Sequence, residues 1–159
     1  MKLSVLAGNT TVFVTATLVL GMVASAQASG GKQCSTANVS GQWGFTINGS
    51  IPSIGPVGAI GMFTQDSSGN ITGTETRSLN GDIADETLTG TATVSSDCSG
   101  SDSFQVFENG VLVRTSVVSL VYDENQQHAR AVFTSIVLPD GTVLPSILTV
   151  DANRLFPNN

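Results

Sequence analysis

Few residues in this 159-residue chain could carry chemistry, and their spacing does not bring them together. The single histidine, His128, would need a nucleophile or an orienting carboxylate to act as a general base, and no sequence motif supplies one. Asp85-Glu86 and Asp123-Glu124 are adjacent pairs, so extended structure sends the two side chains of each pair to opposite faces. We therefore interpret His128 and both acidic pairs as solvated turn residues and predict no catalytic residue.

Metal binding has equally little support in the sequence. One histidine and two cysteines cannot complete a zinc site. The turns at 66–70 and 97–102 offer oxygen ligands to calcium, but neither has the ligand spacing of an EF-hand. Their Asp, Ser, Gly and Asn are also the residues that such turns need for their own geometry. We predict neither a metal site nor a cofactor.

The two cysteines, Cys34 and Cys98, predict one disulfide, because an even count in an exported chain indicates pairing. Closing a loop of about 65 residues stabilises the fold by roughly 4 kcal/mol in the chain-entropy model. A catalytic thiol is the alternative, and it would need a nearby base, for which His128 is the only histidine.

Residues 1–28 have the layout of a secretory signal peptide: a positive start, an apolar run over 11–23, and the cleavage site Ala26-x-Ala28. The apolar run is shorter than the ~20 residues of a spanning helix, so we favour cleavage over an uncleaved membrane anchor. We expect one domain, residues 29–159, that is secreted or periplasmic, with no membrane span after cleavage.

The charge of the mature chain excludes two classes of partner. Five Lys and Arg residues remain against twelve Asp and Glu residues, a net charge of −7. The sequence has no basic stripe for nucleic acid, and anionic membrane surfaces would repel it. We therefore expect no nucleic-acid partner.

Clusters of Gly, Asn, Asp and Pro punctuate the chain after Cys34, and the runs between them are rich in Thr and Val, as in strands. The first of these runs starts one residue before Gly41. We expect eight strands joined by short hairpins, at 40–48, 57–65, 70–79, 86–95, 102–108, 111–122, 127–138 and 142–151.

This antiparallel meander predicts an all-β, eight-stranded antiparallel up-and-down β-barrel. A flat sheet would leave two exposed edges, whereas closure removes both, and eight strands enclose an interior that is just filled or holds one small ligand. A β-sandwich is the alternative. An outer-membrane barrel is disfavoured, because one Trp and one Tyr cannot form aromatic girdles.

The only tryptophan, Trp43, stands two residues after Gly41 at the start of the first expected strand. This Gly-x-Trp layout resembles the calycin barrels, lipocalins above all, in which it closes one end of the barrel. Tyr122-Asp123 before the seventh strand and Arg154 after the eighth resemble two further lipocalin positions, the second being an arginine that stacks on the tryptophan. The resemblance implies that Trp43, Tyr122 and Arg154 are structural residues at a sealed end.

Closure into a barrel and the apolar connection at 49–57, stiffened by two prolines, favour a function: an exported, non-enzymatic barrel that binds a small apolar ligand or a protein partner. One alternative is a structural or cell-surface interaction module with a filled core. Another is a small barrel cyclase or isomerase, for which Glu75, Arg77 and Arg114 are the strand-borne charges we would nominate. The stretch Asp97–Gly100 (DCSG) is similar to a DCxG motif of small exported bacterial proteins, which implies no particular activity.

The connection 49–57, GSIPSIGPV, is expected to be the longest and most apolar loop, and it lies at the end opposite Trp43. Ile51 and Ile54 either cover a cavity or pack on the neighbouring rim. With Pro56 they are the candidate ligand-binding residues.

Both faces of the last three expected strands carry Val, Leu, Ile or Phe, although a barrel wall facing water needs one polar face. This pattern predicts that a partner covers the outside of strands 6 to 8, and a homo-oligomer is one such arrangement.

Overall fold

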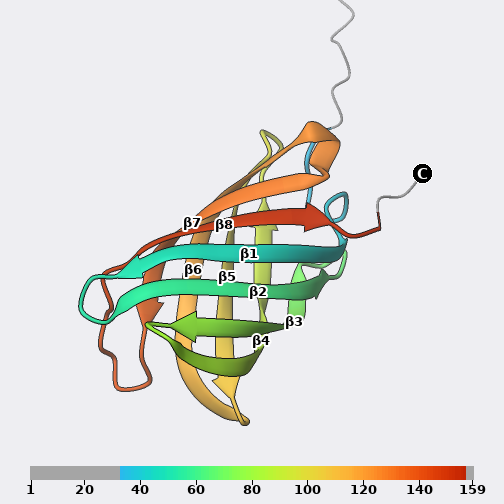
Figure 1. The fold of residues 1–159 in the computed structure, drawn as a ribbon. Coiled ribbons are helices and arrows are strands. Elements are labelled where there is room, and N and C mark those ends of the chain that lie inside the picture. Colours follow the sequence, from blue (N-terminus) through green and yellow to red (C-terminus); the bar gives the residue numbers. More distant parts are fainter. Residues whose placement is uncertain (1–32, 157–159) are drawn as a thin grey trace, which may run out of the picture. The chain divides into compact units, whose positions relative to one another are not determined.

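The structure, a computed structural model, describes residues 33–156, which form a closed antiparallel barrel in which each strand pairs with the next and β8 pairs with β1 (Figure 1). The predicted up-and-down barrel is confirmed. The expected signal peptide lies outside the described residues. None of the helical structure in the described part is long and apolar enough to cross a membrane. The strands are β1 Gly41–Ile51, β2 Gly55–Gln65, β3 Asn70–Leu79, β4 Asp82–Val94, β5 Ser99–Glu108, β6 Val111–Asp123, β7 His128–Val137 and β8 Ile147–Arg154, with a 3-10 turn, η1, at Glu124–Gln126.

Two-residue Asn-Gly turns join β3 to β4 and β5 to β6. Asn80 and Gly81 have φ values of 51° and 91°, and Asn109 and Gly110 have values of 51° and 78°. Asn and Gly are the residues that accept two successive positive φ angles, and the twist of such turns matches that of the strands they join. Strand pairing in both hairpins therefore continues up to the two turn residues, and β4 begins four residues earlier than the sequence predicted.

The expected loop 49–57 is wrong in its extent. β1 and β2 continue as a paired ladder up to Ile51 and Gly55, so the turn between them holds only three residues. The longest connection is instead 138–146, between β7 and β8, which pair with each other only over His128–Val132. Beyond Val132 the two strands do not pair with each other, and Val143 of the connection instead forms an isolated bridge with Val137 at the end of β7.

Two β-bulges change which residues of β6 and β7 face inward. Val113 is an extra residue opposite β5, and Thr134 is an extra residue opposite β6. Side chains along a regular strand point alternately inward and outward, and a bulge adds one residue to this pattern. Two residues an odd number of positions apart, one on each side of the bulge, therefore point to the same face. Phe133 and Ile136 therefore both point into the barrel, with exposed fractions of 7% and 1%.

Part of the second apolar face that the sequence indicated is thus interior surface, because Val113 and Ile136 line the inside of the barrel. Val111, Val121 and Val132 remain exposed on the outside of β6 and β7. Homo-oligomerisation through strands 6 to 8 stays a prediction.

Phenylalanine rings lie inside the barrel opposite glycines on the neighbouring strand. Phe45 pairs with Gly61, and Phe104 pairs with Gly90. A Cβ added to Gly90 would lie 2.3 Å from the Ser103 carbonyl oxygen and 2.7 Å from Cβ of Phe104, so no larger residue fits without moving backbone. The glycines allow the strands to bend sharply, and the facing rings occupy the interior volume that the missing side chains leave.

Candidate functional site

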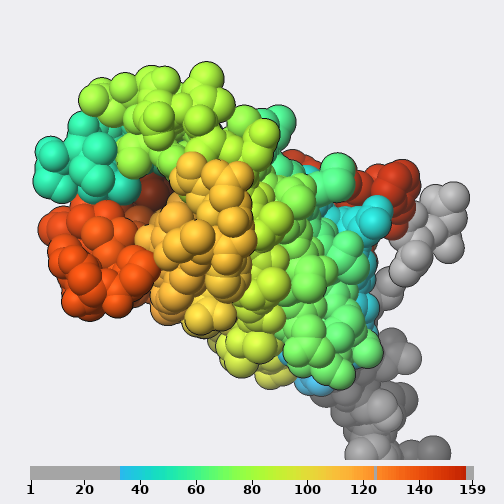
Figure 2. Space-filling view, turned by 90° about the horizontal axis from the view of Figure 1, so that it is seen from below, coloured from blue at the N-terminus to red at the C-terminus, as the bar shows by residue number. Residues whose placement is uncertain are grey.

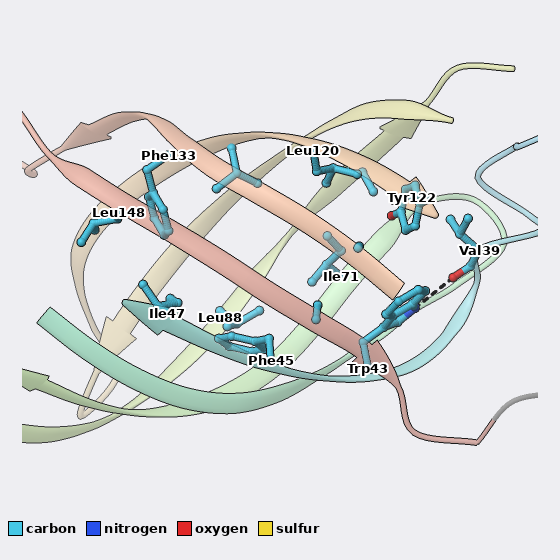
Figure 3. Packing of buried hydrophobic residues seen from close by; sticks show 14 of the residues in the cluster. Val39, Trp43, Phe45, Ile47, Ile71, Leu88, Leu120, Tyr122, Phe133 and Leu148 are labelled. Atoms are coloured by element: carbon cyan, nitrogen blue, oxygen red, sulfur yellow. Dashed lines mark hydrogen bonds between the residues drawn. The ribbon is translucent and has the colours of Figure 1, made fainter. Parts of the chain in front are cut away.

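One end of the barrel is sealed by Trp43, which is fully buried and donates a hydrogen bond from Nε1 to the carbonyl of Val39 at 3.0 Å (Figure 3). Arg154 lies opposite Trp43 in the β1–β8 ladder, and its guanidinium carbon is 5.7 Å from the centre of the indole ring. Tyr122 packs edge-on against the same ring at 5.6 Å. The resemblance to calycins implied that these three residues share one end, and in the structure Trp43 contacts both Arg154 and Tyr122 there.

A disulfide between Cys34 and Cys98 fastens the segment before β1 to the β4–β5 turn, with a Cα–Cα distance of 4.9 Å, so the predicted pairing is confirmed. Cys98 has a φ of 69°. Asp97 stabilises this turn, because its Oδ1 accepts hydrogen bonds from the backbone N and Oγ of Ser99. A disulfide of this kind fits an oxidising compartment outside the cytoplasm.

Beyond Trp43, the barrel holds an inner cavity of about 70 Å³ whose walls are almost entirely apolar. Three of its rings form a continuous series: Trp43 stacks on Phe63 at 6.3 Å, and Phe63 contacts Phe45 at 5.9 Å. On the opposite wall the rings of Phe104 and Phe133 meet edge to face, with 6.1 Å between their centres. The aromatic residues of the wall are Trp43, Phe45, Phe63, Phe104, Tyr122 and Phe133.

Asp102 and Glu75 are the only charged residues that line this aromatic cavity. Asp102 has an exposed fraction of 8%, and its Oδ1 has no hydrogen-bond partner among the described residues. Burial raises the pKa of Asp102 to about 7. Burial and the nearby Asp102 carboxyl also raise the pKa of the Tyr122 phenol.

The other end of the barrel opens into a mouth pocket of about 200 Å³, which is the hollow visible in Figure 2 between the β1–β2 turn (teal) and the β7–β8 connection (orange-red). Ile47 and Phe133 line both this pocket and the inner cavity, so the two spaces adjoin. Ile51 and Ile54 line the mouth pocket, Ile51 buried and Ile54 with 41% of its surface exposed.

Pro56, the third candidate ligand-binding residue, lies on the exposed side of β2 and is not part of the mouth wall. Other apolar residues of the wall come from the β7–β8 connection and from β8, which the sequence did not indicate as a site. They include Leu138, Leu144 and Leu148.

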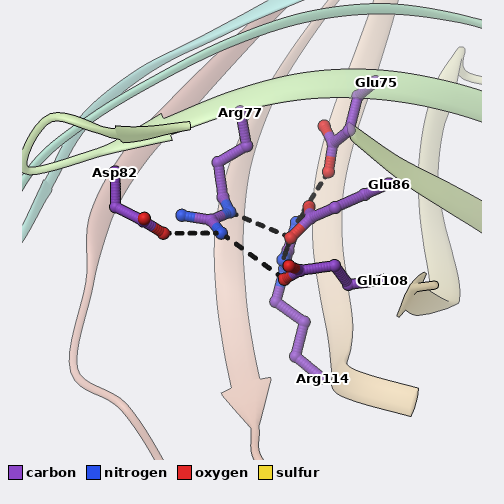
Figure 4. Close-up of polar contacts among 6 residues, drawn as sticks. All are labelled: Glu75, Arg77, Asp82, Glu86, Glu108 and Arg114. Carbon is purple, nitrogen blue, oxygen red and sulfur yellow. Dashed lines mark hydrogen bonds and ion pairs between the residues drawn. The ribbon is translucent and has the colours of Figure 1, made fainter. Parts of the chain in front are cut away.

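A buried ion cluster stands at the mouth pocket, built from charged side chains of β3, β4 and β6 (Figure 4). Glu86 is at its centre: Arg114 donates to both of its carboxylate oxygens at 2.8 and 2.7 Å, and Arg77 Nε donates to Oε1 at 2.9 Å. Arg114 also donates to Glu75 at 2.6 Å. Glu108 is a more distant partner, 3.9 Å from Arg77.

The two central carboxyl groups, Glu75 and Glu86, are directly opposite each other in the β3–β4 ladder, but they titrate differently. Burial raises the pKa of Glu75 to about 7 against the opposing effect of Arg114, and the neighbouring Glu86 adds to the rise. Burial also acts against the charged form of Glu86, but the hydrogen bonds from Arg114 and Arg77 outweigh it and lower its pKa. The cluster therefore holds one firmly ionised carboxylate between two guanidinium groups, and one carboxyl close to its midpoint at neutral pH.

His128 sits outside the barrel wall between two carboxylates. Its Nδ1 is 3.0 Å from Asp123 Oδ1 and its Nε2 is 2.9 Å from Asp151 Oδ2. Asp123 also accepts a hydrogen bond from Arg130. The hydrogen bond to Asp151 is the main cause of a raised His128 pKa. No nucleophile accompanies these groups in the contacts of the described residues.

No group of His, Cys, Asp and Glu side chains within residues 33–156 has the geometry of a metal site. In the turn at 66–70, the Asp66 carboxylate accepts hydrogen bonds from Ser68 and Asn70. Those bonds give Asp66 a role in the turn itself.

Sequence reasoning missed the two most informative buried carboxyl groups, Glu86 and Asp102. Glu86 was interpreted as a solvated turn charge, but its exposed fraction is 2% because β4 starts at Asp82. Asp102 was placed at the edge of a turn, although β5 begins at Ser99. The signal was the alternation Asp102, Phe104, Val106, which places the carboxyl on the same face as two apolar residues.

No known family model and no curated protein sequence matches this chain. Among solved structures, the fold is similar to that of a redesigned β-barrel, mFAP1, which was solved bound to DFHBI. The two share 17% sequence identity with a TM-score of 0.51, and the match covers 75% of this chain and 97% of that one. This likeness concerns the fold, so the resemblance to calycins stays a prediction from Gly41, Trp43 and Arg154.

Proposed function

We propose that the barrel binds one small, largely apolar ligand in its interior and that the ligand enters through the mouth opposite Trp43. The observation that carries the proposal is the pair of adjoining spaces, the inner cavity and the mouth pocket, inside a barrel whose other end is sealed. Binding sites for small molecules are concave, mostly apolar and equipped with a few polar groups that orient the ligand. The redesigned barrel with a similar fold was solved with a small molecule bound, which supports the proposal by analogy.

The wall of the mouth supports the proposed entrance. β7 and β8 do not pair beyond Val132, so the rim there depends on the 138–146 connection rather than on a hydrogen-bonded ladder. Ile54 is half-exposed at the tip of the β1–β2 turn and lines the same rim. An apolar ligand would bury this isoleucine and the leucines around it.

The test is a fluorescence titration of the protein with N-phenyl-1-naphthylamine, a neutral apolar probe. We expect saturable binding of one probe per barrel. Ala131 lines the inner cavity, so Ala131→Leu should fill part of it and weaken binding about tenfold or more. Val132→Leu, at the adjacent exposed position, is the matched control and should leave binding unchanged. Absence of saturable binding, or equal affinity in both variants, would overturn the proposal.

Export and a non-enzymatic role are part of the same proposal. The Cys34–Cys98 bond supports an oxidising location, and the signal-peptide layout of residues 1–28 supports export. Expression of the full chain in cells followed by mass spectrometry of the exported fraction tests it, since a mature N-terminus at residue 29 is expected. An unprocessed chain retained in the cytoplasm would contradict it.

A further inference from the structure

The inner cavity contains a carboxyl group for which its walls provide no partner. Asp102 is more than nine-tenths buried, and its Oδ1 faces no hydrogen-bond donor among the described residues. A buried polar group without a partner costs free energy, and a buried charge without a counterion costs far more. The fold therefore keeps Asp102 in a place where a ligand could supply the missing donor.

The walls around Asp102 are suited to a cation. Six of the eight aromatic residues in the described part of the chain line this cavity, and Trp43 and Tyr122 are among them. The faces of aromatic rings attract organic cations, which is the basis of aromatic cages for ammonium groups. No Lys, Arg or His side chain lines the cavity.

The charged groups between the cavity and the mouth are acidic on balance. The ion cluster and its periphery contain two guanidinium groups, those of Arg77 and Arg114, and four carboxyl groups. The carboxyl groups stay in excess even when Glu75 carries a proton. A cation entering from the mouth therefore meets a field that attracts it.

We propose that the inner cavity binds the ammonium group of an organic amine, which pairs with the Asp102 carboxylate while the apolar body of the ligand extends into the mouth pocket. The volumes of the inner cavity and the mouth pocket limit the size of the ligand's head group and of its apolar body. The cavity of about 70 Å³ holds a head group of two or three heavy atoms, and the mouth pocket of about 200 Å³ accepts one aromatic ring or a short alkyl chain. Arylalkyl amines are the ligand class with these proportions. This inference deepens the proposed function and rests on it.

A carboxylate-bearing ligand is the competing chemistry, because Nη1 of Arg77 is buried without a hydrogen-bond partner among the described residues. Its remaining nitrogens already face Glu86, Asp82 and Glu108, so an added anion would be repelled by three carboxylates. The experiment below therefore includes a carboxylate ligand alongside the amine.

The experiment compares three ligands with the same ring and different head groups: 2-phenylethylamine, 2-phenylethanol and 3-phenylpropanoate. Displacement of N-phenyl-1-naphthylamine from the full-length protein at pH 7.5 gives the affinity of each. We expect the amine to bind at least tenfold more tightly than the alcohol and the carboxylate. Asp102→Asn and Asp102→Leu should both remove this preference while leaving the affinity for the alcohol within about threefold of the wild-type value.

Asp85→Asn is the matched control, since Asp85 lies one strand away on the outer face of β4 and its removal changes the net charge by the same amount. It should keep the preference for the amine. If the neutral probe binds but the three head groups bind equally, or the carboxylate binds most tightly, the amine site is overturned and the proposed function stands. If no probe and no ligand binds, the proposed function fails, and the amine site fails with it.

Discussion

Trp43 and Arg154 lie directly opposite each other in the ladder between β1 and β8, the strand pair that closes the barrel. The guanidinium of Arg154 covers the indole ring at 5.7 Å and donates hydrogen bonds to the carbonyls of Asn38 and Ser40. One side chain thus fastens the last strand, the first strand and the segment before it. Closure of the sheet and sealing of the barrel end therefore depend on the same contact.

Replacement of Arg154 by alanine should lower the free energy of unfolding by about 2 kcal/mol. The loss combines a cation–π contact with hydrogen bonds from a charged donor to two carbonyls. Urea denaturation followed by tryptophan fluorescence measures it. Arg130→Ala, which removes an exposed arginine paired with Asp123, should cost less than about 1 kcal/mol. Equal losses in the two variants would contradict a sealing role for Arg154.

Gly90→Ala should destabilise the barrel by about 3 kcal/mol or prevent folding, because the added Cβ would lie 2.3 Å from the Ser103 carbonyl oxygen. Gly58→Ala is the control: a Cβ there meets nothing within 4 Å, so stability should be unchanged or slightly higher. Thermal unfolding by circular dichroism compares the two. A Gly90→Ala protein as stable as Gly58→Ala would show that the strands can shift to make room.

Reduction of the Cys34–Cys98 disulfide should lower the free energy of unfolding by roughly 4 kcal/mol, because the bond closes a loop with a sequence separation of 64 residues. Denaturation with and without reductant measures the difference. The double variant Cys34→Ser and Cys98→Ser should match the reduced protein and should not respond to the reductant. A response of the double variant would assign the effect to something other than the bond.

Glu86→Gln should cost about 3 to 5 kcal/mol, because it leaves Arg77 and Arg114 without their shared buried counterion. Glu108→Gln removes a carboxylate that is 39% exposed and 3.9 Å from Arg77, and its effect should stay below about 1 kcal/mol. Urea denaturation of both variants tests the contrast. Similar, small losses would indicate that water already screens the cluster.

Stability should fall as the pH rises from about 5 to 8. The Asp102 carboxyl ionises near pH 3.8 in the unfolded chain but keeps its proton up to about pH 7 in the folded one. Between these values the folded protein binds more protons, so the free energy of unfolding decreases with pH. At 1.36 kcal/mol per pKa unit, the shift of Asp102 from 3.8 to about 7 corresponds to roughly 4 kcal/mol in all, of which roughly 3 kcal/mol is lost between pH 5 and pH 7. Glu75 changes in the same direction.

The raised pKa of His128 acts in this direction too, because its contacts with Asp151 and Asp123 favour the protonated ring and weaken as the ring loses its proton. Melting temperatures from pH 4.5 to 8.5 measure the trend. Asp102→Asn removes one titrating group, so its melting temperature should vary less with pH than that of the wild type. An unchanged pH dependence in this variant would contradict the pKa assigned to Asp102.

The sequence predicted the closed barrel, with a β-sandwich as the alternative, and it predicted the Cys34–Cys98 disulfide; both predictions are confirmed. Alternation of threonine with apolar residues over 87–94 and the spacing of the turns are local signals, and they correspond to β4 and to most strand boundaries. The up-and-down order also puts the start of β1 and the ends of β6 and β8 at one end of the barrel, where Trp43 contacts Tyr122 and Arg154.

Only the tertiary structure decided what the interior contains. Bulges at Val113 and Thr134 depend on how neighbouring strands fit together, so no local alternation reveals them. Glu75 and Arg114 are 39 residues apart and meet only because closure brings β3 and β6 face to face across the barrel. Asp102 looks like a turn residue until the strands around it bury it. Whether a side chain is buried, and which side chains it contacts, depends on how the sheet closes. The sequence therefore indicated a barrel but not the carboxyl groups inside it.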